Sequence, residues 1–231
     1  MNQSFTWRDY MANGHINEIY EAATKLFLQQ GYSKTQISHI AKAIGVSVGT
    51  IYHDFTGKEE IMHFILKCTI DPGFINKEFD RPVTDELFVG LEQEIVAAFE
   101  MSAEQFAMNL EKVGNAYDFK KFVSDAFDTL SRYAVGCLFI EKNYMDCPVL
   151  AEQYHKYRKK FFNTMKEYIT GFMTKGVIRP INNIELTTSL IIEILTWWAM
   201  DMRYTSFETS DVPVEQAKEV CLDNIVNAYR A

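Results

Sequence analysis

Apolar side chains recur at intervals of three and four residues along most of this 231-residue chain. That spacing places them on one face of an α-helix and predicts an all-α fold without strands. Short clusters of proline, glycine and asparagine separate the helical stretches, as turn residues do. Helices are expected over residues 36–44, 48–55, 58–69, 84–110, 119–143, 149–175, 184–205 and 213–230, with a loop over 74–83.

The most distinctive local pattern is residues 36–57, QISHIAKAIGVSVGTIYHDFTG. Gly45 follows the last apolar residue of the first helix, where glycine can adopt the left-handed backbone that ends a helix. Ser47 is placed to cap the second helix, and Val46 and Ile51 can pack together across that cap. Two further capping pairs are expected, Ser33 with Gln36 and Thr56 with Glu59.

Two short helices joined by a tight turn are the layout of a helix-turn-helix, whose second helix enters the DNA major groove. The second helix, residues 48–55, has few charges for a solvated face. Gly49 lets its backbone lie close to another surface, and Thr50 is suited to touch a base edge or a thymine methyl. An ordinary helical hairpin without DNA binding is the alternative interpretation of the same spacing.

The run from Ile16 to Leu66 resembles the TetR family of transcriptional regulators over about fifty residues. The resemblance implies a three-helix DNA-binding domain, and it makes a full-length relationship the expectation. The C-terminal two thirds has the expected helical layout but no diagnostic motif. The segments that carry the resemblance are INEIYEAATKLFLQQGY, ISHIAKAIGVSVGTIYHDF and TGKEEIM.

The resemblance also implies where DNA is contacted. The start of the first motif helix and Lys58 are expected to meet phosphates, while the second helix faces the groove. Three positions depart from the family pattern: Gln36 stands where Thr is usual, Val48 where Lys or Arg is common, and Asp54 where His, Arg or an aromatic is common. Asp54 is therefore given the alternative role of bracing the motif. The expected DNA-binding residues are Thr35, Gln36, Ser47, Val48, Gly49, Thr50, Tyr52, His53 and Lys58.

The net charge of −8 is unusual for a DNA-binding protein. Residues 1–60 carry five basic and six acidic residues, so most of the excess acid lies in the remainder of the chain. Without a strong basic patch, we expect binding to rely on groove fit and on two paired motifs, with modest nonspecific affinity.

Other function classes find little support in the sequence. The four cysteines are scattered without metal-ligand spacing, so reduced thiols, no metal and no cofactor are expected. There is no phosphate-binding loop, GxSxG or HExxH motif, so we predict that the protein is not an enzyme. No signal peptide or membrane span is recognised, which predicts a cytoplasmic protein. His155 and the basic run Lys156, Arg158, Lys159 and Lys160 are interpreted as a solvated face.

The helix expected over residues 184–205 is apolar nearly all round, so it must be covered on more than one side. The last helix adds small apolar residues at spacings of three and four, which permit close approach. We therefore predict a homodimer whose interface is formed by residues 184–205 and 213–230, with a monomer that buries the first helix centrally as the alternative. The stripe on the last helix is Val214, Ala217, Cys221, Ile225 and Ala228.

Glu193 stands among isoleucines and leucine in that apolar helix, where a buried carboxylate needs a partner. An ion pair is one interpretation. The other is a pocket acid for a cationic effector, with aromatic ring faces beside it. The expected effector-binding residues are Phe99, Phe106, Tyr133, Tyr157, Glu193, Trp197 and Asp201.

Together these patterns predict an N-terminal helix-turn-helix DNA-binding domain, residues 1–60, with residues 1–12 as a candidate disordered segment. A larger helical ligand-binding and dimerisation domain follows over residues 61–231. The expected function is a homodimeric, ligand-responsive transcriptional regulator, a repressor that a cationic or aromatic small molecule releases from operator DNA. The alternative is a helical protein–protein interaction module that does not bind DNA.

Overall fold

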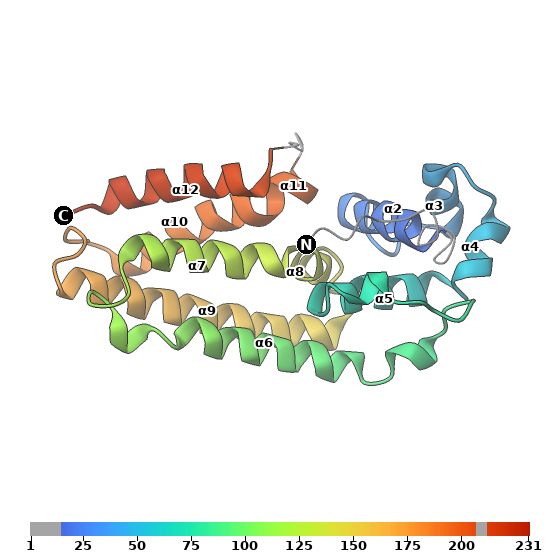
Figure 1. Ribbon diagram of the computed structural model, residues 1–231, viewed down its shortest axis with the longest axis horizontal. Coiled ribbons are helices and arrows are strands. Elements are labelled where there is room, and N and C mark those ends of the chain that lie inside the picture. Colours follow the sequence, from blue (N-terminus) through green and yellow to red (C-terminus); the bar gives the residue numbers. More distant parts are fainter. Residues whose placement is uncertain (1–14, 207–211) are drawn as a thin grey trace.

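The computed structural model describes residues 15–206 and 212–231, and throughout these ranges the elements are helices joined by turns (Figure 1). The expected disorder of residues 1–12 lies outside the described residues. A small head occupies one end of the elongated molecule, and α5 joins it to a longer bundle (Figure 1). The head and α5 comprise α2 (Ile16–Gln29), α3 (Ile37–Ile44), α4 (Val48–Asp54) and α5 (Lys58–Ile70).

The bundle runs lengthwise, with α6, α7 and α9 side by side and α10 and α12 along one edge (Figure 1). Within the described ranges no helix is both long and apolar enough to cross a membrane. The bundle helices are α6 (Leu91–Ala107), α7 (Phe119–Arg132), α8 (Ala134–Lys142), α9 (Pro148–Thr174), α10 (Ile184–Thr196), α11 (Met202–Tyr204) and α12 (Val214–Tyr229).

The helix-turn-helix forms as its sequence predicts. Gly45 ends α3 with a left-handed backbone (φ 73°), and the Val46 N–H closes the turn on the Ala41 carbonyl at 3.0 Å. The Ser47 hydroxyl oxygen accepts from the Thr50 N–H at 3.1 Å and so caps α4. Ile51 is fully buried, which fixes the α4 face that packs on the head.

The two other predicted capping pairs are wrong. The Ser33 hydroxyl donates to Asp146 of the bundle, and α3 begins at Ile37 with Gln36 as its flanking residue. The Thr56 hydroxyl donates to the Val83 carbonyl at 3.1 Å, and α5 begins after Gly57. In both places a side chain suited to capping is used for a contact distant in sequence, which local pattern cannot reveal.

Two long predicted helices are interrupted. Gly90 has a left-handed backbone (φ 84°), so the segment predicted to be helical from residue 84 contains a short 3-10 turn, Asp85–Phe88, before α6 begins at Leu91. Leu87, within this segment, is 44% exposed. The helix predicted over 119–143 breaks at Tyr133 into α7 and α8.

The helix predicted over residues 184–205 is present as a continuous rod with one irregularity. Its middle, Trp197–Asp201, is a π-helical turn between α10 and α11. An inserted wide turn of this kind changes which side chains face inward after it. Ala199 and Met200 are buried there, whereas Trp197 is 48% exposed.

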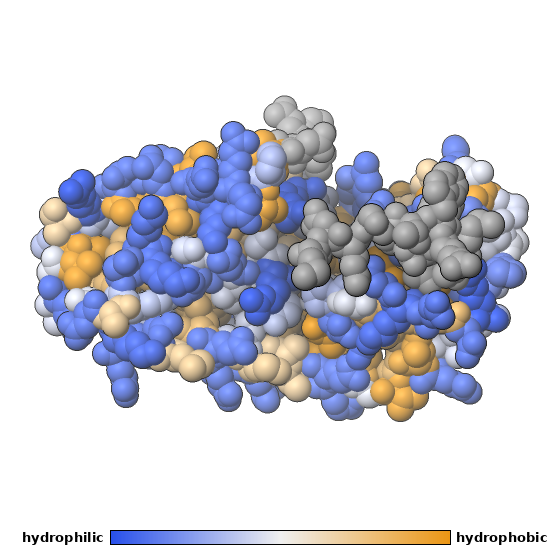
Figure 2. Space-filling view, in the orientation of Figure 1, coloured by the Kyte–Doolittle hydropathy of each residue, from blue (hydrophilic) through white to orange (hydrophobic). Residues whose placement is uncertain are grey.

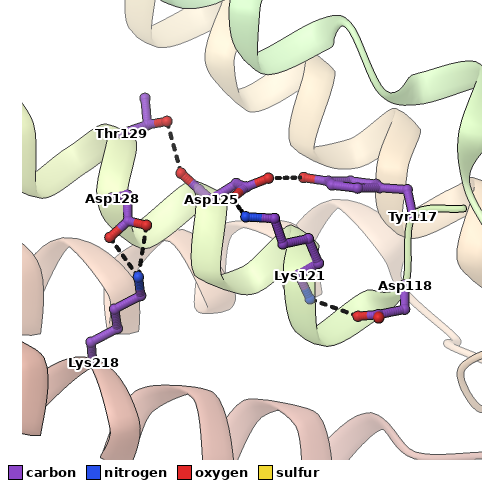
Figure 3. Close-up of polar contacts among 7 residues, drawn as sticks. All are labelled: Tyr117, Asp118, Lys121, Asp125, Asp128, Thr129 and Lys218. Carbon is purple, nitrogen blue, oxygen red and sulfur yellow. Dashed lines mark hydrogen bonds and ion pairs between the residues drawn. The ribbon is translucent and has the colours of Figure 1, made fainter.

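Most of the predicted stripe on α12 packs against its own chain, although Val214 is only half-buried and Ala228 is exposed. Ala217, Cys221 and Ile225 are buried, and α12 lies along α7. Lys218 pairs with both carboxylate oxygens of Asp128 on α7 at 2.7 Å (Figure 3).

A second polar cluster fixes the start of α7 (Figure 3). The Asp118 carboxylate caps the helix by accepting the Lys121 N–H at 2.7 Å. Asp125, one turn further on, accepts from the Lys121 ammonium at 2.7 Å and from the Tyr117 hydroxyl at 3.0 Å. These contacts join the loop before α7 to the helix itself.

Candidate functional site

The outer face of α4 is presented to solvent. Val48 is 40% exposed and Tyr52 50% exposed, and both stand out because large hydrophobic side chains are normally covered. The Thr50 hydroxyl lies 3.0 Å from the Ser47 hydroxyl, so the cap also orients the Thr50 side chain. The exposed residues of the predicted DNA-contacting set are Gln36, Ser47, Val48, Gly49, Tyr52 and His53, with Thr50 half-buried.

Thr35 was predicted to be exposed to DNA, but the structure contradicts this prediction. Its side chain is fully buried, its hydroxyl donates to the Gly31 carbonyl at 2.8 Å, and it accepts from Gln30 at 3.0 Å. A phosphate cannot reach that hydroxyl without displacing these partners. The Thr35 side chain therefore holds the turn before α3 and is not available to contact DNA.

Lys58 is likewise turned inward. Its ammonium donates to the carbonyls of Tyr32 at 2.9 Å and Thr35 at 3.0 Å, and it lies 4.1 Å from the centroid of the Tyr32 ring. These contacts tie the start of α5 to the turn between α2 and α3. At most one of its three protons is left for a phosphate.

Asp54 braces the motif, as the alternative interpretation predicted. Its side chain is almost completely buried, and its Oδ1 lies 3.2 Å from both Arg81 Nη1 and His53 Nδ1. Its Oδ2 accepts from the His15 N–H at 3.3 Å. The Arg81 guanidinium offsets the charge of this buried carboxylate and so reduces its repulsion of a nearby phosphate.

Two lysines that the sequence analysis did not select flank the exposed surface. Lys34 lies just before α3 and Lys42 lies in its last turn, and both are exposed. No ion pair involves either ammonium within the described ranges. Both could have been identified from the sequence as candidate phosphate contacts by their positions at the two ends of the first predicted motif helix.

The bundle contains a partly open cavity of about 620 Å³ lined by residues of α7, α8, α9 and α10. This volume is typical of a site for a drug-sized molecule. Aromatic and aliphatic side chains form most of the wall; the basic lining residues come from α9, and the two carboxylates come from α8 and α10. The lining residues are Thr129, Leu130, Tyr133, Cys137, Glu141, Tyr154, His155, Tyr157, Arg158, Lys159, Phe161, Phe162, Ser189, Ile192, Glu193, Thr196 and Met200.

Only three of the seven predicted effector residues, Tyr133, Tyr157 and Glu193, line this cavity. The other four lie elsewhere. Phe99 stacks behind Tyr157 with ring centroids 5.1 Å apart, and Phe106 lines a separate polar recess of about 200 Å³. Trp197 points outward, and Asp201 accepts the Thr205 hydroxyl at 2.6 Å. Periodicity identified aromatic positions but could not separate cavity wall from core.

The charged rim differs from the expectation in two respects. Glu193 is exposed at the cavity and is not buried, so it does not need an internal partner. His155, Arg158 and Lys159 are exposed, as their interpretation as a solvated face predicted, but they also line the cavity.

The rim is electrically balanced. Glu141 accepts from the Tyr154 hydroxyl and from Arg158, each at 2.8 Å. Arg158 and Lys159 offset Glu141 and Glu193 in formal charge when histidine is neutral. Burial raises the pKa of the Tyr154 hydroxyl well above its ordinary value and that of the Cys137 thiol to about 12, so both groups stay neutral.

The cavity wall is joined to the head through α8. Glu141 lines the cavity, and two residues later the buried Asn143 accepts the Tyr32 N–H at 2.7 Å while donating to the Phe139 carbonyl at 2.9 Å. The rings of Phe27 and Tyr32 lie against Phe139, with centroids 6.1 Å apart in each case. A shift of α8 would therefore displace the turn that precedes α3.

Comparison with known proteins places the similarity in the head. Residues 19–64 match the family model of bacterial regulatory proteins of the tetR family. The HTH-type transcriptional regulator HbdR of Aromatoleum sp. (strain CIB) is 46% identical over 55 residues, which are 24% of each chain. The fatty acid metabolism regulator protein of Bacillus subtilis (strain 168) is 42% identical over 50 residues, 22% of this chain and 26% of the relative. These matches span about a quarter of each relative.

Solved structures resemble the whole fold at low sequence identity. The ketosteroid transcriptional regulator KstR2 of Mycobacterium tuberculosis has a TM-score of 0.55 at 16% identity, covering 95% of this chain and 96% of that chain. The probable transcriptional regulatory protein RHA5900 has a TM-score of 0.54 at 14% identity, covering 92% and 97%. These likenesses concern the fold: a helical head followed by a larger helical bundle.

Proposed function

The chain belongs to the TetR family of bacterial regulatory proteins by its N-terminal domain, and from this premise we propose that it is a ligand-responsive transcriptional repressor. The observation that carries the proposal is the exposed face of α4, where Tyr52 and Val48 stand uncovered beside a capped, oriented Thr50. We place the DNA contacts on Gln36, Ser47, Val48, Gly49, Thr50, Tyr52 and His53, with Lys34 and Lys42 on flanking phosphates.

The proposed mechanism is linkage between two sites. A ligand in the cavity favours a position of α8 and α5 in which the paired heads no longer match successive major grooves. DNA and ligand then oppose each other by a single coupling free energy, typically about 1–3 kcal/mol. The contact of Asn143 with the Tyr32 N–H supports this route, because it joins the cavity helix directly to the head.

The proposed function is tested by selecting DNA from a random-sequence duplex library with the wild-type protein and titrating salt. Binding through several phosphates gives a log–log salt slope of about −0.9 per phosphate neutralised. Failure to select any sequence, together with a flat salt dependence, would favour the alternative of a helical protein–protein interaction module.

We propose a homodimer formed mainly through α10. Leu186 is 68% exposed and Leu190 54% exposed; together with Trp197 they follow one another at helical spacing, and Val220 of α12 is also uncovered. Apolar patches interrupt the hydrophilic surface along the edge formed by α10 and α12 (Figure 2). An unpaired apolar stripe of this kind is typical of a self-complementary interface.

Leu190→Glu is expected to convert the dimer into monomers. The carboxylate would be buried opposite its own copy across a twofold axis, while the isolated chain loses little because Leu190 is exposed. Operator affinity should fall by about 100-fold or more with loss of the second head. Sedimentation velocity measures the assembly state, with Val89→Glu as the exposed control; a dimeric Leu190→Glu chain would contradict the interface.

We propose an aromatic effector with a predominantly apolar body, since Tyr133, Tyr157 and the phenylalanines of α9 dominate the wall. A more specific proposal is that the effector also carries a cationic group, which would lie beside Glu193. The rim offers a cation no net attraction, because Arg158 and Lys159 balance the two carboxylates. Glu193→Gln distinguishes these two proposals. The substitution should weaken binding of a cationic effector and leave binding of a neutral aromatic effector unchanged.

Ser189→Trp is expected to fill the cavity and abolish binding of the fluorescent probe anilinonaphthalene sulfonate. Ser189 lines the cavity from α10, so an indole at that position occupies the space that a ligand needs. The measurement is probe fluorescence, with Glu167→Trp on the outer face of α9 as a control of equal size. Unchanged fluorescence in Ser189→Trp would place the probe, and the proposed effector site, elsewhere.

A further inference from the structure

The C-terminal end of α4 is held by a segment that follows α5 in sequence. Residues 77–84, named the strap here, run beside the end of α4 and form a parallel bridge between Val83 and Phe55. The Val83 N–H donates to the Asp54 carbonyl at 2.8 Å, and the Thr56 N–H donates to the Val83 carbonyl at 3.1 Å. Backbone contacts thus fix the strap to the residues that end the DNA-reading helix.

A side-chain contact reinforces this pairing. Arg81 of the strap lies 3.2 Å from the Asp54 carboxylate, which is almost completely buried. The same carboxylate accepts from the His15 N–H and lies beside the ring of His53. Asp54 therefore joins the end of α4, the start of α2 and the strap at one point.

The strap leads directly into the bundle. Asp85, the residue after it, lies 2.9 Å from His63 of α5, and the His63 and Phe88 rings are 5.7 Å apart. Gly90 then turns the chain into α6, whose Phe99 stacks on the cavity-lining Tyr157. A continuous set of contacts therefore runs from the cavity wall through α6 and the strap to the end of α4.

We propose that Arg81 and Asp54 are positioning residues for DNA reading, and that the strap couples the orientation of α4 to the position of α6. This inference rests on the proposed function, because it assigns the strap to the control of the same DNA-contacting surface. Neither residue needs to touch DNA; each acts by holding α4 at the angle from which Thr50 and Tyr52 reach the groove.

Two substitutions that change the charge in opposite directions, at Asp54 and at Arg81, distinguish this positioning role from a direct electrostatic effect on DNA binding. Asp54→Asn removes an acid near DNA, so electrostatics alone predicts tighter binding, whereas loss of positioning predicts weaker binding. Arg81→Gln removes a base and should weaken binding in either case. We expect both variants to bind the selected operator about tenfold more weakly, a difference of about 1.4 kcal/mol, and the double variant to be no weaker than either.

Two further variants make the measurement specific. Arg81→Lys keeps a cation beside Asp54 and should recover part of the affinity. Lys77→Ala removes a positive charge from the same strap, where Lys77 pairs with the exposed Asp71, and should leave operator binding within about twofold. Equal or tighter operator binding by Asp54→Asn would overturn the proposal.

Hydrogen exchange tests the strap without DNA. In Asp54→Asn and Arg81→Gln, amides of residues 48–56 and Val83 should exchange about tenfold faster, while those of α7 and α9 stay unchanged. Unchanged exchange in α4 would overturn the positioning role, and faster exchange throughout the chain would indicate general destabilisation and overturn it as well. If the wild-type protein selects no DNA, the proposed function fails, and the exchange result alone decides whether the strap holds α4.

Discussion

Joint replacement of Thr50 and Tyr52 by alanine is expected to abolish sequence-specific DNA binding. Tyr52 is half exposed on α4, and the Thr50 hydroxyl is oriented by the Ser47 cap. Each specific side-chain contact to DNA contributes about 1–3 kcal/mol, so loss of both in two paired heads should weaken the operator complex by about 100-fold or more. Fluorescence anisotropy with a selected duplex measures the change.

The matched control is Tyr144→Ala. Tyr144 is 57% exposed, close to the exposure of Tyr52, but it follows α8 of the bundle and is not part of α4. Its removal should leave operator affinity unchanged. Equal losses in both proteins, or retained specific binding by the double variant, would mean that the exposed face of α4 does not read DNA.

Phe64→Ala is expected to cause the largest loss of stability among the substitutions considered. Phe64 is fully buried on α5, and its ring lies 5.5 Å from Phe55 of the head, 5.3 Å from Phe79 of the strap and 5.4 Å from Phe74. Truncation of such a phenylalanine leaves a cavity and costs about 3–5 kcal/mol of unfolding free energy. Denaturant-induced unfolding followed by circular dichroism measures it.

Two comparison variants define what the Phe64 result means. Phe64→Leu retains most of the apolar volume and should lose clearly less than Phe64→Ala. Val89→Ala, at a side chain that is 83% exposed, should change stability by no more than about 0.5 kcal/mol. A loss for Phe64→Ala as small as that for Val89→Ala would show that the Phe64 ring does not hold α5, the head and the strap together.

The local structure of the head was predictable because its signals are local. The positive φ of Gly45 and the cap formed by Ser47 follow from residue types within one turn of where they act. The broad layout of the bundle followed similarly from apolar spacing and turn residues. The break at Tyr133 did not, because no glycine or proline marks it and only packing with neighbouring helices shows it.

Site residues were harder to predict wherever their role depends on contacts distant in sequence. Thr35 and Lys58 were assigned to phosphate by family pattern, yet Lys58 donates to the Thr35 carbonyl and both side chains support the turn before α3. Asp54 was noticed because its charge was out of place, and its partner Arg81 lies in a stretch predicted only as a loop. A sequence can show that a residue is unusual at its position without identifying the residue with which it forms an ion pair.

Two neighbouring faces of α10 border different spaces, the cavity on one side and the molecular surface on the other. Ser189, Ile192, Glu193 and Thr196 face the cavity, while Leu186 and Leu190 face outward. In the proposed dimer this one helix would border both the cavity and the partner chain, so we expect ligand binding and chain pairing to be coupled. Dilution that separates the proposed dimer is therefore expected to alter the cavity to which the proposed effector binds. If so, an apparent effector dissociation constant would hold only at a stated chain concentration.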